Sequence, residues 1–144
     1  MLLAAACDYL DTRESTYETV HEAHAAGAVD QGWVPEYLPP SAREIRERHN
    51  VATSEVWGRF EFKAGDLAQT AHACRPVDVR EVSLPGAETR GTAWWAEMLR
   101  TDRSAAAEHF ELHACGTVPQ TAQRRFLAVH RRMPTAFYWT TVAE

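Results

Sequence analysis

The chain has 144 residues and a mass of 16.2 kDa, which suits one compact domain with its own hydrophobic core. Hydrophobic residues make up 45% of it and charged residues 24%, so the composition excludes a disordered, collagen-like or disulfide-dense chain. The formal net charge of -5 argues against a partner role for nucleic acid, whose phosphates attract basic surfaces.

The first eight residues read MLLAAACD, and small residues before a cysteine, preceded by leucines, resemble the end of a bacterial lipoprotein signal peptide. By this resemblance, Cys7 is the lipidated first residue of the mature protein. We therefore expect residues 1–14 to be a signal remnant and lipid-anchored tether, and residues 15–144 to form a single globular domain. The interpretation requires a positively charged segment and a longer apolar stretch before Met1. The alternative is a short apolar N-terminus of a cytosolic protein.

Capping signals predict three helices in the first half of the chain. A hydroxyl residue followed three positions later by a carboxylate is typical of a helix N-terminus. This pattern predicts helices over 15–26 and 41–50, and a related pattern at Asp66 predicts a third that ends before Pro76. Gly27 is expected to follow the first helix. In the second, Arg43–Glu47 and Glu44–Arg48 have the spacing of helical ion pairs.

Alternating apolar residues predict strands, mostly in the last third of the chain. The expected strands are 55–62, 77–84, 108–114, 125–130 and 136–142, and 92–99 is expected to be a short helix. The last two strands flank a four-residue connection, as in a hairpin. The sum predicts an α+β fold in which three to four short helices pack on a mainly antiparallel sheet with a C-terminal hairpin.

Aromatic residues supply the candidate binding site. Trp33 and Tyr37 lie in a proline-rich segment that is too apolar for a free loop, and Trp94 is adjacent to Trp95. Neighbouring residues on a helix point about 100° apart, so these two tryptophans cannot both face the core. Aromatic side chains of this kind suit an interface with a protein or a sugar, although core packing also accounts for them.

The cysteines other than Cys7 form an even pair, Cys74 and Cys115. In an oxidising compartment such a pair commonly forms a disulfide. Two alternatives remain open: unlinked thiols, or a zinc site that uses the patterns His72-Ala-Cys74 and His113-Ala-Cys115. The disulfide is favoured, because the spacing does not match the usual zinc sites. His21 and His24 are also spaced for metal binding but lack the carboxylate arrangement of a catalytic motif. We expect no metal and no cofactor.

Three motifs resemble a family of small bacterial lipoproteins to which no activity is assigned. They are the turn Gly32-Trp-Val-Pro35, the segment Pro40-Ser-Ala-Arg43 and the segment Thr53-x-Glu-x-Trp-x-x-Phe60. The resemblance extends over most of the chain. It implies a protein of the bacterial cell envelope on the periplasmic side, anchored to the membrane by its lipid.

These observations favour a membrane-tethered, non-enzymatic envelope lipoprotein that binds a protein partner. An immunity or hydrolase-inhibitor role for the lipoprotein is one subtype of this function. The sequence contains no Gly-x-Ser-x-Gly, Ser-x-x-Lys or glycine-rich phosphate loop. The alternative is an envelope enzyme or a carbohydrate-binding module with an aromatic cleft. That alternative requires the predicted aromatic rings to gather in one concave site.

Overall fold

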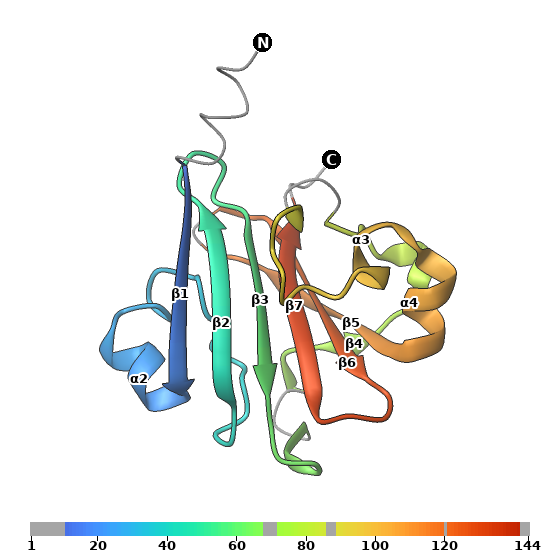
Figure 1. Ribbon diagram of the computed structural model, residues 1–144, viewed down its shortest axis with the longest axis horizontal. Coiled ribbons are helices and arrows are strands. Elements are labelled where there is room, and N and C mark those ends of the chain that lie inside the picture. Colours follow the sequence, from blue (N-terminus) through green and yellow to red (C-terminus); the bar gives the residue numbers. More distant parts are fainter. Residues whose placement is uncertain (1–10, 68–71, 86–88, 120, 142–144) are drawn as a thin grey trace.

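A single antiparallel sheet dominates the computed structural model, which describes residues 11–67, 72–85, 89–119 and 121–141 (Figure 1). Within these ranges seven strands follow the order β1-β2-β3-β7-β6-β5-β4. The strands are β1 (Thr12–Thr19), β2 (Arg43–Asn50), β3 (Val56–Glu61), β4 (Arg75–Pro76), β5 (Phe110–Thr117), β6 (Arg124–His130) and β7 (Thr135–Thr141). The helices are α2 (Val20–Ala25), α3 (Met98–Thr101), α4 (Arg103–His109) and the 3-10 turn η2 (Val79–Glu81).

The predicted α+β class is wrong, because the described part of the chain is β-rich and its three α-helices are short. Segment 41–50, predicted as a helix, forms strand β2 from Arg43 onward, which pairs with β1 on one side and β3 on the other. Its charges are spaced for helical ion pairs, but Ile45, Glu47 and His49 also alternate as in a strand, and all three are buried. Pairing on both sides outweighs the weak helical preference.

The helix predicted over 15–26 is also mostly strand. Residues 12–19 form β1, and helix α2 begins only at Val20. The side chain of Thr19 accepts a hydrogen bond from the backbone of Glu22, so the cap lies four residues after the predicted one. Gly27 follows the helix as expected and adopts φ +78°, a conformation that glycine tolerates.

The predictions for the second half are mixed. Strand β3 and the hairpin of β6 and β7 lie where the alternation places them, and β5 begins at Phe110. The strand predicted over 77–84 is instead the 3-10 turn η2, closed by reciprocal bonds between Asp78 and Glu81. The helix predicted over 92–99 forms only from Met98. Cys7 and part of the helix predicted from Asp66 lie outside the described residues.

Two different segments cover the two faces of the sheet. We call the face covered by α2 and the following loop face A, and the face covered by the segment from Val77 to α4 face B. Along β7, Ala136 and Tyr138 point to face A while Phe137 and Trp139 point to face B. Both faces are therefore buried, and the central strands are apolar on both sides.

Indole groups attach the covering segment to face B. Trp57 Nε1 donates to the hydroxyl of Thr92 at 3.0 Å, and Trp139 Nε1 donates to the carbonyl of Ser83 at 2.7 Å. Thr92 also accepts from Arg48 on β2 at 3.0 Å. These contacts hold a segment with little regular structure against the strands, because each buried indole needs an acceptor.

Candidate binding site

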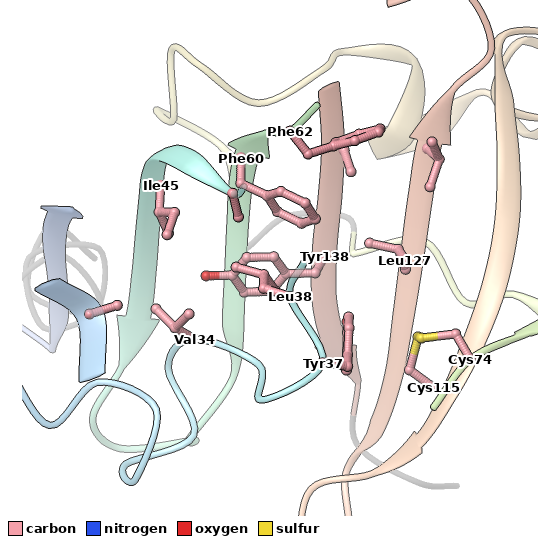
Figure 2. Close-up of a cluster of buried hydrophobic side chains, with 14 of the residues drawn as sticks. Val34, Tyr37, Leu38, Ile45, Phe60, Phe62, Cys74, Cys115, Leu127 and Tyr138 are labelled. Atoms are coloured by element: carbon pink, nitrogen blue, oxygen red, sulfur yellow. A yellow bond between two sulfur atoms is a disulfide. The ribbon is translucent and has the colours of Figure 1, made fainter. Parts of the chain in front are cut away.

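The loop from Ala28 to Ala42 crosses face A and forms the roof of the candidate site (Figure 2). The carbonyl of Ala28 accepts hydrogen bonds from the backbone of Trp33 and Val34, at 3.0 and 3.2 Å, which turns the chain back over the sheet. Val34 and Leu38 are buried on the strands, and Ile45 lies beneath the loop. The prolines of this loop restrict its backbone, so the roof is held in one path.

A row of side chains across face A forms the floor. Glu47 on β2 pairs with Gly58 on β3, and Gly58 pairs with Tyr138 on β7. A Cβ atom at position 58 would lie 2.1 Å from Cζ of Tyr138, so only glycine leaves room for the tyrosine ring. Figure 2 shows the phenol of Tyr138 pointing across the neighbouring strand, and its hydroxyl donates to the carbonyl of Trp33 at 2.9 Å. Floor and roof are thus joined directly.

A buried acid and a histidine lie together under the loop. Glu47 is fully buried, and its Oε2 is 2.8 Å from Nδ1 of His49. The indole of Trp33 stacks on the His49 ring, with ring centroids 4.0 Å apart and planes 8° apart. The other oxygen of Glu47 has no hydrogen-bond partner among the described residues. The pair is therefore a part of the floor, covered by Trp33.

Burial determines the charge state of this pair. It raises the pKa of Glu47 to about 8, although Ser15, opposite on β1, acts to lower it. Burial also lowers the pKa of His49, and the positive charge of Arg13 on β1 lowers it further. At neutral pH the pair is therefore uncharged, and the protonated carboxyl of Glu47 donates to Nδ1 of His49. The remaining ring proton of His49 is then on Nε2.

Two clefts open side by side at the margin of the loop. The first has a volume of about 350 Å³ and is lined by Glu36, Tyr37, Arg125, Tyr138 and Trp139 among others. The second has a volume of about 340 Å³ and is lined by Trp33, His49 and the turn between β2 and β3. Both include four residues: Asp30, Gly32, Val56 and Val118. The two clefts therefore adjoin each other, and together they are here called the face A cleft; each is of the size that small-molecule and peptide anchors occupy.

An ion pair closes one side of the face A cleft. Nη1 of Arg125 contacts both carboxylate oxygens of Glu36, at 2.9 and 2.7 Å, and its guanidinium lies 5.4 Å from the ring centre of Tyr37. Burial is the largest single effect on the pKa of Glu36 and acts to raise it. The hydrogen bond from Arg125, a backbone hydrogen bond and the positive charge of Arg125 together keep this pKa below its ordinary value. The hydroxyl of Tyr37 is buried without a partner among the described residues.

The structure does not bring the four predicted aromatic residues together. Trp33 and Tyr37 are on face A, where they line the two parts of the cleft. Trp95 is 5% exposed in the core of face B, and Trp94 donates to Glu14 on β1 at 2.8 Å. As expected for neighbours, one tryptophan is buried and the other only partly so. A single aromatic platform for a sugar is therefore not formed by these rings.

The predicted disulfide is present and joins Cys74 to Cys115 in the core of face A (Figure 2). It links the residue before β4 to β5, which lies next to β4 at the end of the sheet. The two sulfurs are therefore not available as zinc ligands. No group of three or more His, Cys, Asp or Glu residues in the described part of the chain is arranged to hold a metal ion.

The sequence analysis missed Glu47 and His49 because it assigned Glu47 to an exposed helical ion pair. Arg43 is instead near Glu61 on β3, at 3.7 Å. The available signal was the spacing of Ile45, Glu47 and His49 at every second position, which places them on one face of a strand. Recognising it required knowing that both sides of β2 are paired.

Comparison with known proteins gives one match. The family model described as the YbbD head domain matches residues 11–61, which extend from the start of β1 to the end of β3 and include the loop over face A. No curated protein and no solved structure shows a significant match. In the described part of the chain, none of the helices has the length and apolar character needed to cross a bilayer. The family match suggests a bacterial envelope-associated protein, and the disulfide is consistent with a periplasmic or envelope location.

Proposed function

We propose that this chain is a membrane-tethered, non-enzymatic domain of the bacterial envelope that binds a segment of a partner protein in the face A cleft. The observation that carries the proposal is that two clefts adjoin each other at the margin of one restrained loop and share four lining residues. The match to the YbbD head domain supports it, because residues 11–61 supply most of the second cleft. The same match and the disulfide support the proposed location in the envelope.

The chemistry of the cleft favours a protein partner. The lining of the first cleft is mostly aromatic and aliphatic, with Asp30, Glu36 and Arg125 as its charged groups. Protein interfaces use this combination of an apolar centre and a polar rim. Val51, at the end of the second cleft, is 54% exposed, which adds an apolar contact outside the concave part. The net charge of -5 favours a basic partner, as would suit an immunity or inhibitor role.

Binding accounts for the titratable groups better than catalysis. A general acid or base must reach the proton that it transfers. Glu47 is the carboxyl whose pKa is raised to about 8, yet it is fully buried and does not line the cleft. His49 lines the second cleft, but one face of its ring is covered by Trp33. The pair therefore suits a rigid floor for a bound segment.

A photo-crosslinking residue at Val51 tests the proposal in the intact envelope. We expect it to crosslink to one defined protein, whereas the same residue at Met133 should not. Met133 is the matched control, because it is equally exposed, at 54%, but lies in the turn between β6 and β7 at the opposite end of the sheet (Figure 1).

The purified partner then provides the quantitative test. Val51→Glu should weaken its affinity about tenfold or more, because a charge enters an apolar contact, while Met133→Glu should leave it unchanged. Equal crosslinking at both positions would contradict the proposal. Hydrolysis of peptidoglycan fragments by the purified chain would favour the enzyme hypothesis instead.

The tether at Cys7 is tested separately. We expect Cys7→Ser to release the protein from the membrane fraction, because the thiol is the proposed site of acylation, and mass spectrometry should show the lipid on the unmodified chain. A Cys7→Ser protein that remains in the membrane fraction would contradict the anchor but leave the cleft untouched.

A further inference from the structure

A concentration of arginines lies next to the face A cleft, with which it shares Arg125. Arg75, Arg80, Arg103, Arg124 and Arg125 line one groove of about 600 Å³ between the start of β6, the end of β5 and the 3-10 turn η2. Glu81 is the carboxylate in its wall, while Asp78 and Glu36 pair with Arg80 and Arg125, so five arginines stand against three carboxylates. This local excess of positive charge occurs in a chain whose net charge is -5, so it does not follow from composition.

Three of these arginines are held in place by the fold. Nη1 of Arg103 donates to the carbonyls of Val79 and Val82, at 2.8 and 2.7 Å. Nη2 of Arg124 donates to the hydroxyl of Ser83 at 2.9 Å, and its guanidinium lies 5.4 Å from the ring centre of Phe126.

Arg125 is held in the same way, because its Nε donates to the carbonyl of Cys115 at 2.8 Å. Anchored guanidinium groups lose little conformational entropy when they bind a ligand.

The anchoring contacts do not use all of the donors. Nε of Arg124 is buried and has no hydrogen-bond partner among the described residues. A buried donor without an acceptor is costly, so an acceptor that enters the groove is favoured at this position. Arg75 is exposed on the two-residue strand β4, and Arg80 is exposed beside it, where Asp78 contacts its Nε at 3.0 Å. These two side chains add mobile positive charge at the mouth of the groove.

We propose that this arginine groove binds a ligand with two or more phosphate groups. Guanidinium groups match phosphate oxygens through paired hydrogen bonds, and several of them around one groove suit several anionic groups. The volume of about 600 Å³ is within the range of small-molecule sites. It is larger than one phosphate group fills. The hydroxyls of Ser83 and Thr117 are further donors in the wall. The ligand is a soluble polyphosphate compound or the headgroup of an anionic lipid, which share this chemistry.

Calorimetric titration of the full chain with tripolyphosphate at low ionic strength tests the site. We expect saturable binding that weakens as salt is added, because the contacts are between exposed charges. The double variant Arg75→Gln/Arg80→Gln removes the two exposed arginines of the groove, of which Arg80 contacts Asp78, and it should weaken the affinity about tenfold. Arg132→Gln is the matched control, because Arg132 is exposed in the turn between β6 and β7, and it should bind as the unmodified chain does.

Arg124→Lys examines the geometry of the groove, since it keeps the charge but removes the planar fork. It should also weaken binding, with the folded state verified by thermal unfolding; if this variant does not fold, the double variant still decides. The proposal would be overturned if tripolyphosphate did not bind, or if Arg132→Gln weakened binding as much as the double variant does. It would also be overturned if a polyglutamate peptide bound more tightly than tripolyphosphate.

Vesicles that contain cardiolipin, an anionic lipid whose headgroup has two phosphates, identify the source of the phosphate. Vesicle binding that tripolyphosphate displaces and that Arg75→Gln/Arg80→Gln weakens supports a lipid headgroup as ligand. Tripolyphosphate binding without vesicle binding supports a soluble ligand at the same groove.

Discussion

The two faces of the sheet are both buried but are built from different chemistry. Face B is packed with aromatic rings: Trp95 meets Phe137 and Trp139 edge to face, with ring centres 5.3 and 5.9 Å apart. Face A contains an acid, a histidine and a disulfide, and it borders the cleft. Dense aromatic packing contributes stability, whereas polar groups and open volume reduce it. The comparison shows that face B has the more uniformly aromatic core, whereas face A combines its core with polar groups and the open volume that the proposed binding would use.

The largest effect is expected on face B. Trp95→Ala should lower the free energy of unfolding by about 3–5 kcal/mol, because it removes a large ring at the centre of the aromatic cluster and leaves a cavity. Urea denaturation followed by circular dichroism measures this. A loss below about 1 kcal/mol would mean that the ring contacts of face B do not carry the stability.

The disulfide is the covalent link within the core of face A. Its cysteines are separated by 41 positions, so replacing both with serine should lower stability by about 2–4 kcal/mol through the gain in unfolded-chain entropy. Thermal unfolding with and without a reducing agent gives the same comparison for the unmodified chain. If the unfolding temperature did not change with the reducing agent, the packing around the two cysteines, and not the disulfide, would stabilise this edge of the sheet.

Gly58 tests how tightly the floor of face A is packed. Gly58→Ala should lower stability by about 1–3 kcal/mol, because its Cβ would overlap the ring of Tyr138. In a Tyr138→Ala background the same substitution should cost much less, since the ring is gone. A double-mutant cycle that shows additive effects would contradict the direct contact.

The smallest effect concerns the charge of Glu47. Its pKa is about 8 in the folded chain and near its ordinary value of 4.5 when unfolded, so the folded state holds the proton more strongly. The stability from this group is fully present below pH 4.5 and is lost as the pH rises through 8. Between pH 7 and 9 the unmodified chain should therefore lose about 1 kcal/mol.

Glu47→Gln should remove this loss, because the amide does not titrate. The measurement is urea denaturation of both proteins at pH 7 and 9. His49 titrates below this window, because its pKa is lowered from 6.5. Parallel pH profiles for the two proteins would show that Glu47 is not the buried acid responsible.

Prediction from sequence succeeded where local pattern and tertiary environment agree. Strands β6 and β7 alternate between residues of face A and residues of face B around a short turn, so their pairing depends on neighbours in the sequence. Strand β3 was predicted for the same reason. The candidate site was predicted only in part, since Trp33 and Tyr37 line the cleft while Trp94 and Trp95 belong to the opposite side of the sheet.

Residue order alone determined the alternating strands of the last third, the glycine after α2 and the availability of two cysteines for one bond, since each depends on local geometry or on count. Only the tertiary structure decided that residues 43–50 are a strand, because their charges fit a helix equally well until β1 and β3 pair on both sides. That pairing also buries Glu47 and brings Trp33 over His49. Contacts between distant segments carry this information, and no window of the sequence contains both partners.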